Sequence, residues 1–210
     1  MVLQSLEFLP AQPSDAKAAS RMLFETFIKK ATFLLGLGND QRARKILETI
    51  FSIQGHRLSY EYTEIIVYQG QTIGVITSFP GKMLGRLERK LDVLLWKQYR
   101  LRGKFLLFLR GYPLLFIKET SDDQYFLSHL AVKRKWRGKG AGSSALAHVE
   151  EMARRAGLLQ VSLMVNIDNG DARRFYERHG YSINAIHLES NKRVPHLGPG
   201  YQRMVKRLER

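Results

Sequence analysis

YFLSHLAV (125–132), KRKWRGKGAG (133–142), LQVSLMVN (159–166) and NGDARRFYERHGY (169–181) are the four segments that decide the fold. The first and third are short apolar runs of the kind found in strands. The second is a basic loop punctuated by glycines, and the fourth has the charge and aromatic content of a short helix. The sequence therefore predicts strand, glycine-rich loop, helix, strand and closing helix in that order.

The glycine-rich loop leads into a predicted helix that ends before Gly157. Its apolar residues recur at helical spacing: Ala145, Leu146, Val149, Met152, Ala153 and Ala156. Backbone N–H groups at a helix N-terminus attract anions, and glycine lacks the β-carbon that would hold a phosphate away. Nearby cations add to the attraction: Arg134, Lys135, Arg137 and Lys139. This pattern predicts a site for a phosphorylated ligand.

Two common phosphate-binding motifs fit the loop poorly. The Walker order, which ends in glycine, lysine and serine or threonine, is absent. A dinucleotide fingerprint is loosely met by Gly140, Gly142 and Ala145. However, five residues separate Val132 from the first glycine, and no acidic residue ends a strand about 20 positions on. The ATP and NAD interpretations are therefore disfavoured.

Two motifs in this stretch resemble a known family. Arg137-x-x-Gly140-x-Gly142 resembles the acyl-CoA-binding signature of the GNAT superfamily of N-acyltransferases. The second signature follows one helix and one strand later: Asn169-x-x-Ala172-x-x-Phe175-Tyr176-x-x-x-Gly180-Tyr181. The resemblance is tight over 125–181 and looser over the strands on either side. It implies an α+β, three-layer fold, with a mixed, mostly antiparallel sheet, helices on both faces and a central parallel pair of strands that splay apart.

The resemblance also implies acetyl-CoA as the cofactor. Pantetheine would lie in the gap between Leu127–Val132 and Val161–Asn166, and Tyr176 would place its hydroxyl near the cofactor sulfur. The expected cofactor-binding residues are Leu130, Ala131, Val132, Arg137, Gly138, Lys139, Gly140, Ala141, Gly142, Ser143, Asn169, Ala172 and Phe175. The expected activity is acetyl transfer to a primary amine of an unidentified acceptor, a small molecule or a protein, by direct attack on the thioester.

Tyr176 and His129 are the expected catalytic residues. Backbone N–H groups on the splayed strand can stabilise the oxyanion, and the leaving thiolate needs a proton. A tyrosine hydroxyl has an unperturbed pKa of about 10 and a thiol about 8.5, so Tyr176 can be the donor if it is well positioned. His129 titrates in the range that suits a base, although regular alternation places it opposite Ser128 and Leu130, and a bulge could change its direction.

The base has other candidates. Glu61 and Glu64 are expected on an earlier strand, on opposite faces, so at most one of them can face the active site. Asp168 is expected to cap the closing helix, and deprotonation through water without a single base is also open. His148 is expected to be solvated. No histidine spacing suggests a metal site, and we expect no metal.

Charge and composition bound the function. The chain has 210 residues, a net charge of +15 and no cysteine, which excludes disulfides and a cysteine nucleophile. The excess of positive charge indicates an anionic partner. There is no long apolar run or secretory signal, so we expect a cytoplasmic protein without a transmembrane segment, either monomer or homodimer.

The region from about 81 to 123 is expected to be a basic helical insertion in a single domain spanning 1–210. Ten Lys or Arg residues and only two acidic ones lie between Gly81 and Lys118. Leucines at helical spacing predict one or two amphipathic helices. Packing on the core, covering the substrate and lying on a membrane surface are all open. The alternative function is a non-catalytic or differently acylating module whose insertion binds nucleic acid or an anionic membrane.

The remaining elements follow from local patterns. We expect strands at Leu3–Leu9, Tyr60–Tyr68, Thr72–Phe79, Ser182–Leu188 and Tyr201–Leu208. We expect a helix that starts at Ser14 or Asp15 and another over Asp40–Gln54. A loop is expected at Asn191–Gly200.

Overall fold

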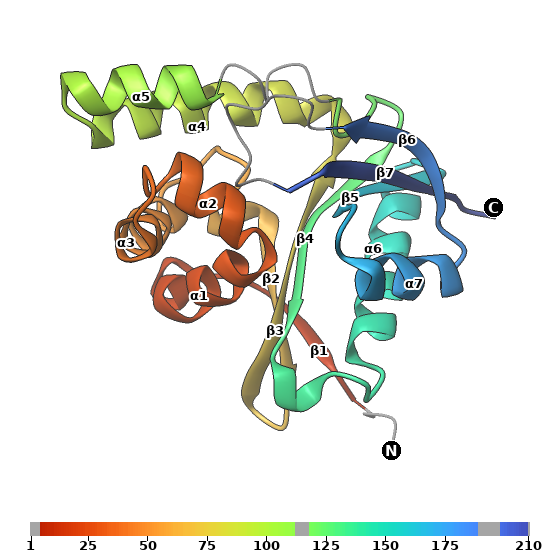
Figure 1. Cartoon of the computed structure of the whole chain (residues 1–210). Coiled ribbons are helices and arrows are strands. Elements are labelled where there is room, and N and C mark those ends of the chain that lie inside the picture. The colour runs from red at the N-terminus through yellow and green to blue at the C-terminus, as the bar shows by residue number, and fades with distance from the viewer. Residues whose placement is uncertain (1–4, 112–117, 189–197, 210) are drawn as a thin grey trace.

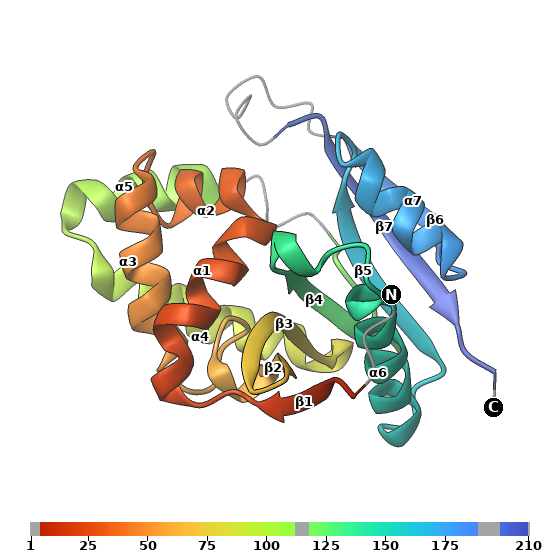
Figure 2. The same cartoon turned by 90° about the horizontal axis from the view of Figure 1, so that it is seen from below.

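A mixed sheet of seven strands forms the centre of the computed structural model, which describes residues 5–111, 118–188 and 198–209 (Figures 1 and 2). The strand order is β1-β2-β3-β4-β5-β7-β6. The strands are β1 (Glu7–Pro10), β2 (Thr63–Tyr68), β3 (Gln71–Pro80), β4 (Tyr125–Val132), β5 (Gln160–Asn166), β6 (Ser182–Leu188) and β7 (Gly200–Arg207).

Helices cover both faces of this sheet. Figure 1 shows α1 (Ala16–Thr26), α2 (Ile28–Leu34) and α3 (Asp40–Phe51) on one side of β4, and α6 (Ala141–Arg155) with α7 (Gly170–Arg178) on the other. Two further helices, α4 (Leu84–Gln98) and α5 (Leu101–Gly111), lie at one end of the molecule. The expected three-layer α+β architecture is confirmed, and the basic segment from about 81 to 123 contains the helices α4 and α5.

All neighbouring strands pair antiparallel except β4 and β5. This parallel pair is short, because it runs only from Tyr125 opposite Val161 to Leu127 opposite Leu163. On its other edge β4 stays paired with β3 as far as Val132. β5 likewise stays paired with β7 through Asn166. The two strands therefore diverge after Leu127, as the splay interpretation predicted.

The hydrophobic core lies on both faces of the sheet. Under α6 it includes the fully buried Leu146 and Val149, packed with Leu163 of β5. Under α1 and α3 it includes Phe24 and Phe51, both with no exposed surface. Burying a large apolar side chain contributes roughly 2–3 kcal/mol, so these clusters fix the positions of the helices that flank the splay.

A β-bulge interrupts β4 where the splay begins. Thr77 of β3 is opposite His129, but Ser78 is opposite Leu127, so Ser128 has no residue opposite it. Leu127 and Leu130 both pack on the core under α6, although strict alternation would place residues three apart on opposite faces. The extra residue turns Ser128 and His129 together toward the side of α1 to α3.

Several strands and helices begin or end at other residues than the sequence predicted. The strand expected at Leu3–Leu9 is observed at Glu7–Pro10, with residues 1–4 outside the described part of the chain. The strand expected from Tyr60 begins at Thr63, after a 3-10 turn. The helix expected over Asp40–Gln54 ends at Phe51. Most of the loop expected at Asn191–Gly200 lies outside the described residues.

None of the helices in the described ranges is long and apolar enough to cross a membrane.

Candidate active site

The facing edges of β4 and β5 form the centre of the candidate site. Beyond Leu127 and Leu163 the two strands are no longer paired with each other, while each keeps its other neighbour. The backbone N–H and C=O groups on these inner edges are therefore available to a ligand, as at any unpaired strand edge. Leu130, Ala131 and Val132, expected to bind the cofactor, all lie on this part of β4.

The glycine-rich loop closes one end of this gap. Arg134–Trp136 form a 3-10 turn, and Gly138 and Gly140 have φ of 72° and 88°, in the left-handed region that favours glycine. Gly140 is the N-cap of α6, so the N–H groups of the first turn of this helix have no intrahelical acceptor. The geometry at the helix start is that of an anion site.

Two cations of the loop have different surroundings. The Arg137 Nε donates to the Val132 carbonyl at 2.8 Å, which folds the loop back onto the end of β4. The head of Arg137 stays exposed beside Glu25, 3.9 Å away. The Lys139 Nζ instead lies 5.0 Å from the centre of the Trp136 ring. The Arg137 guanidinium thus stays at the surface beside the start of α6, whereas Lys139 packs on the tryptophan.

An open cavity of about 310 Å³ adjoins this loop. It is lined by Ala18, Arg21, Met22, Glu25, Lys133 and Arg134. Three of these six residues are cations and one is an acid, so the cavity favours an anionic group.

The start of α6 and the helix α7 are packed closely together. A β-carbon on Gly142 would lie 3.1 Å from the Phe175 ring, so glycine is what lets the two helices approach. The Ser143 hydroxyl lies 2.9 Å from the His179 Nε2. The structure thus brings Phe175 next to Gly142 and Ser143, although it lies more than 30 positions after them in the chain.

Asn169, and not Asp168, caps α7. The Asn169 Oδ1 accepts from the Ala172 backbone N–H at 3.1 Å. The prediction that Asp168 is the cap was wrong: its carboxylate pairs with the Lys29 Nζ at 2.7 Å. An acidic side chain next to the helix start was the misleading signal, because asparagine caps equally well.

Tyr176 lies on α7 and packs on the core under α6. Its ring meets Phe175 and Tyr181 edge to face, at 5.2 and 5.8 Å between ring centres. No residue in the described ranges hydrogen-bonds its hydroxyl, and burial raises the pKa of Tyr176 to about 12. Tyr176 is therefore protonated at every physiological pH and has a hydrogen to donate.

His129 lies on the opposite face, against α1. Its Nδ1 is 2.8 Å from the Thr26 hydroxyl oxygen, and that hydroxyl lies 2.7 Å from the Leu23 carbonyl. A carbonyl can only accept, so Thr26 donates its single hydrogen to Leu23 and His129 donates from Nδ1. This leaves the Nε2 of a neutral ring as an acceptor. Burial, followed by repulsion from Arg57, lowers the pKa of His129 to about 3.

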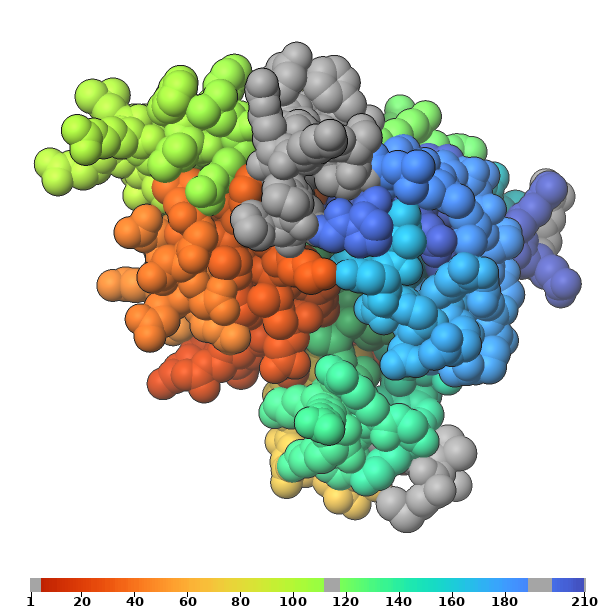
Figure 3. Space-filling view, in the orientation of Figure 1, coloured from red at the N-terminus to blue at the C-terminus, as the bar shows by residue number. Residues whose placement is uncertain are grey.

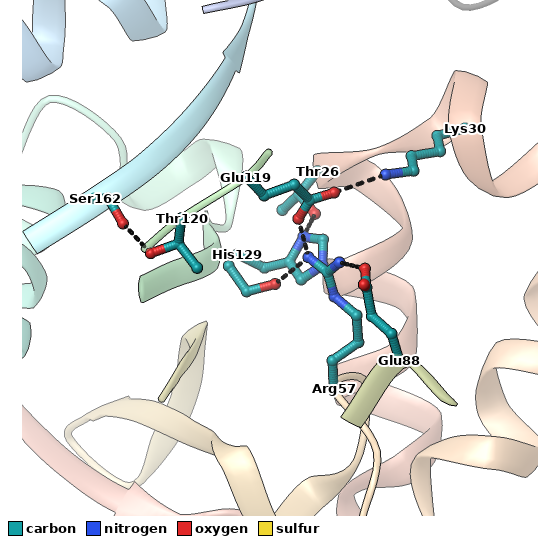
Figure 4. Close-up of polar contacts among 9 residues, drawn as sticks. Thr26, Lys30, Arg57, Glu88, Glu119, Thr120, His129 and Ser162 are labelled. Carbon is teal, nitrogen blue, oxygen red and sulfur yellow. Dashed lines mark hydrogen bonds and ion pairs between the residues drawn. The ribbon is translucent and has the colours of Figure 1, made fainter. Parts of the chain in front are cut away.

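A buried cluster of charges lies beside His129 (Figure 4). Arg57 pairs with Glu119 at 2.5 Å and with Glu88 at 2.7 Å, and it donates to the Ser128 hydroxyl at 3.1 Å. Lys30 pairs with Glu119 at 3.1 Å. Burial alone would raise the pKa of Glu119, but attraction to Arg57 and Lys30 outweighs it and holds that pKa well below its usual range.

The cluster is tied to the bulge and to β5. Arg57 donates to Ser128, the extra residue of the bulge, and Thr120, just after Glu119, hydrogen-bonds Ser162 of β5 at 2.7 Å. Sequence analysis did not identify Arg57, Glu119 or Lys30. The available signal was Glu119 itself, the first acidic residue after Asp92 in a strongly basic stretch.

The prediction that His148 is solvated was wrong, because its ring is paired with the Glu64 carboxylate. The His148 Nε2 lies 3.0 Å from the Glu64 carboxylate, and its ring stacks on Phe8 at 4.2 Å between centres. Both therefore belong to the packing of α6 on β2. Glu61, expected on a strand, lies in the 3-10 turn before β2, and its carboxylate accepts from the Gly55 backbone N–H.

Comparison with known proteins places this site in a family. The acetyltransferase (GNAT) family model matches residues 65–181, more than half of the chain. An aminoalkylphosphonate N-acetyltransferase from Salmonella typhimurium is 46% identical over 55 residues, 26% of this chain and 36% of that protein. The chain thus matches only about a third of that relative's length.

Solved structures share the fold at low sequence identity. An N-acetyltransferase from Staphylococcus aureus Mu50 has a TM-score of 0.70 and 17% identity, over 95% of this chain and 99% of that one. A second acetyltransferase structure has a TM-score of 0.68 and 21% identity, over 98% of this chain and all of the other. The family match and the site geometry agree, and the chain belongs to the acetyltransferase (GNAT) family.

Proposed function

We propose that the protein is an acetyl-CoA-dependent N-acetyltransferase that acetylates a primary amine by direct attack on the thioester. The observation that carries this proposal is the pair of unpaired strand edges, β4 beyond Leu127 and β5 beyond Leu163, beside the N-terminus of α6. We also propose that residues 1–210 form one domain, with about 81–123 as its insertion.

The residues around the gap fit acetyl-CoA. The backbone of Leu130 and Val132 would pair with the pantetheine arm. Ala131 lies between them, but its N–H and C=O face Val75 of β3, because hydrogen-bonded and non-hydrogen-bonded pairs alternate along antiparallel strands. The loop from Arg137 to Gly140 and the first turn of α6, Ala141 to Ser143, would hold the pyrophosphate. Asn169 uses its Oδ1 as a helix cap but keeps its amide N–H groups for the arm. Bound acetyl-CoA supplies an activated acyl thioester.

Tyr176 and His129 would act from opposite sides of the gap. Tyr176 approaches from α7, where its hydroxyl donates to the sulfur as negative charge develops there. His129 faces α1, where its Nε2 accepts a hydrogen bond from the incoming amine and orients the lone pair. A pKa of about 3 makes His129 too weak a base to keep the amine's proton, so the proton passes on to water. Backbone N–H groups on β4 stabilise the carbonyl oxygen.

This proposal is tested by following free CoA. The protein is incubated with acetyl-CoA and a panel of primary amines, which includes an aminoalkylphosphonate because of the short match to a protein of that name. We expect release of CoA that depends on one amine, with an equal amount of the acetylated amine found by mass spectrometry. Binding of acetyl-CoA without amine-dependent release across the panel would favour the non-catalytic alternative.

A matched pair of glycines tests the cofactor loop. Gly138 precedes α6 and Gly157 follows it, both have φ of 72°, and a β-carbon on either would meet no atom within 4 Å. Replacing either by alanine should cost a similar ~1–2 kcal/mol of backbone strain. Only Gly138→Ala should also weaken acetyl-CoA binding, by about tenfold, because the added β-carbon would hold the pyrophosphate away from the backbone N–H groups and weaken a hydrogen bond to a charged group.

Titration calorimetry with acetyl-CoA measures this difference, and thermal denaturation gives the matching loss of stability. Equal effects of Gly138→Ala and Gly157→Ala on the acetyl-CoA affinity would show that the loop does not contact the cofactor.

A further inference from the structure

The helix α5 has an inner face that holds it to the body of the protein. α5 packs against α2, and Leu107 lies on the core under α1 to α3. The Arg110 guanidinium donates to the Phe33 carbonyl at 2.8 Å and lies 4.7 Å from the centre of the Phe33 ring. These contacts fix which side of α5 faces outward.

The outer face of α5 is apolar. Its exposed apolar side chains are Leu101 (84%), Phe105 (63%), Leu106 (39%), Phe108 (58%) and Leu109 (51%). Leu101, Phe105 and Leu109 follow one another at intervals of four, so they share one side of the helix. Trp96 and Val93 of α4 add further exposed apolar surface. Figure 3 shows α5, in bright green, projecting at the upper left.

Cations border this apolar surface. Lys97, Arg100, Arg102 and Lys104 fall within or between the two helices, and no Asp or Glu occurs from Val93 to Lys118. The Lys104 Nζ lies 5.4 Å from the centre of the Trp96 ring, so charge and aromatic surface are adjacent. Arg102 is exposed, next to Leu101. An apolar strip with lysine and arginine beside it has the chemistry of a helix that lies in a membrane interface.

The positive charge of this surface favours an anionic membrane over a second copy of the chain as its binding partner. Two copies meeting through α5 would bring Arg100, Arg102 and Lys104 of each toward the same residues of the other, with no acidic residue in α5 to offset them. An anionic surface neutralises these cations while its acyl layer accepts Leu101, Phe105 and Leu109. Contiguous exposed apolar surface of this kind marks an interaction site.

We propose that the outer face of α5, with the adjoining part of α4, docks on an anionic lipid bilayer. The helix would lie parallel to the bilayer plane, its apolar side chains below the headgroups and its cations among them. This association is independent of the proposed acetyl transfer, because neither Tyr176 nor the loop before α6 takes part in it.

Vesicle co-sedimentation of the full chain tests the proposal. We expect binding to vesicles of phosphatidylcholine with 30% phosphatidylglycerol at low salt, and at least tenfold weaker binding to phosphatidylcholine alone, since each cation near an anionic surface contributes about fivefold. Binding should also weaken in ~0.5 M salt, because dissolved ions then screen the attraction between the cations and the anionic lipids over a shorter distance. No binding to the anionic vesicles at low salt would overturn the proposal.

Matched variants separate docking of this face from attraction by net charge. Vesicle binding should weaken at least tenfold in the α5 variant Leu101→Ser/Phe105→Ser/Leu109→Ser. The control variant removes exposed apolar side chains of β6, Ile186→Ser/Leu188→Ser, and should bind vesicles as the wild type does. Arg102→Glu/Lys104→Glu should bind far more weakly than Lys17→Glu/Lys45→Glu, which changes the net charge equally on α1 and α3.

Two results would contradict the proposal. Equal loss in the two charge variants, with no effect of the serine variants, would mean that net charge alone attracts the protein. Self-association that only the α5 serine variant abolishes, without vesicle binding, would assign the face to a second copy. Circular dichroism of each variant confirms that it is folded.

Discussion

Replacing Tyr176 by phenylalanine is expected to lower kcat for acetyl transfer about 10²- to 10⁴-fold, the contribution typical of general acid–base catalysis. The KM for acetyl-CoA should change little, because the ring keeps its packing against Phe175 and Tyr181 and only the hydroxyl is lost. Steady-state kinetics with the acceptor found in the amine panel measure both constants. A fall in kcat at constant KM is the mark of an interaction made only in the transition state.

Tyr181→Phe is the matched control. Its ring lies 5.8 Å from that of Tyr176, and its hydroxyl donates to the Glu150 carboxylate at 3.2 Å. Losing this buried hydrogen bond should cost about 1 kcal/mol of stability and change kcat by no more than about twofold. If Tyr176→Phe were as active as Tyr181→Phe, Tyr176 would be a packing residue and another group would protonate the sulfur.

The second large effect is expected on stability, from the Arg57–Glu119 pair. Arg57→Met should destabilise the fold by about 3–5 kcal/mol, because among the described residues it leaves the buried Glu119 carboxylate paired with Lys30 alone. Arg57→Met/Glu119→Leu should regain most of this loss, since no buried charge is then unpaired. Glu88→Gln, at the exposed end of the cluster, should cost less than about 1 kcal/mol.

Urea denaturation of the wild type and the three variants measures their free energies of unfolding. If Arg57→Met and the double variant were equally unstable, the loss would come from packing around Phe126, over which the Arg57 guanidinium lies, and not from an unpaired carboxylate.

The same cluster makes the fold sensitive to acid. The folded-state pKa of Glu119 lies below its ordinary value of 4.5, so the unfolded chain takes up this proton first. The stabilisation is full above pH 4.5 and is lost as the pH falls below that value. The pKa of His129 is also lowered, from 6.5 to about 3, so its protonation favours unfolding below about pH 6.5. Melting temperatures should therefore fall from pH 7 to pH 4, less steeply in Arg57→Met/Glu119→Leu.

The contiguous motifs could be predicted from the sequence because each is one local element. A strand, a glycine turn and a helix start are set by residues next to one another, so the elements from Tyr125 to Tyr181 appear where the pattern placed them. The close approach of Gly142 to Phe175 is a tertiary result that the sequence did not predict, although both residues belong to the two motifs.

Features that depend on contacts between residues far apart in the chain could not be predicted from the sequence. Arg57 and Glu119 are 62 positions apart, and each alone resembles an ordinary surface charge. Regular alternation placed Ser128 and His129 on opposite faces, whereas the bulge turns both toward the side of α1 to α3, and nothing in YFLSHLAV gives its position. His148 looked solvated on its helix because its partner, Glu64, lies on another strand.

The central claim is that the diverging edges of β4 and β5 and the loop before α6 hold acetyl-CoA. Amide hydrogen exchange with and without CoA tests it most directly. The account predicts slower exchange with CoA in Ser128–Val132 and in Gly138–Ser143, and no change in the edge strand β6. Protection confined to other segments, with these two unchanged, would contradict it.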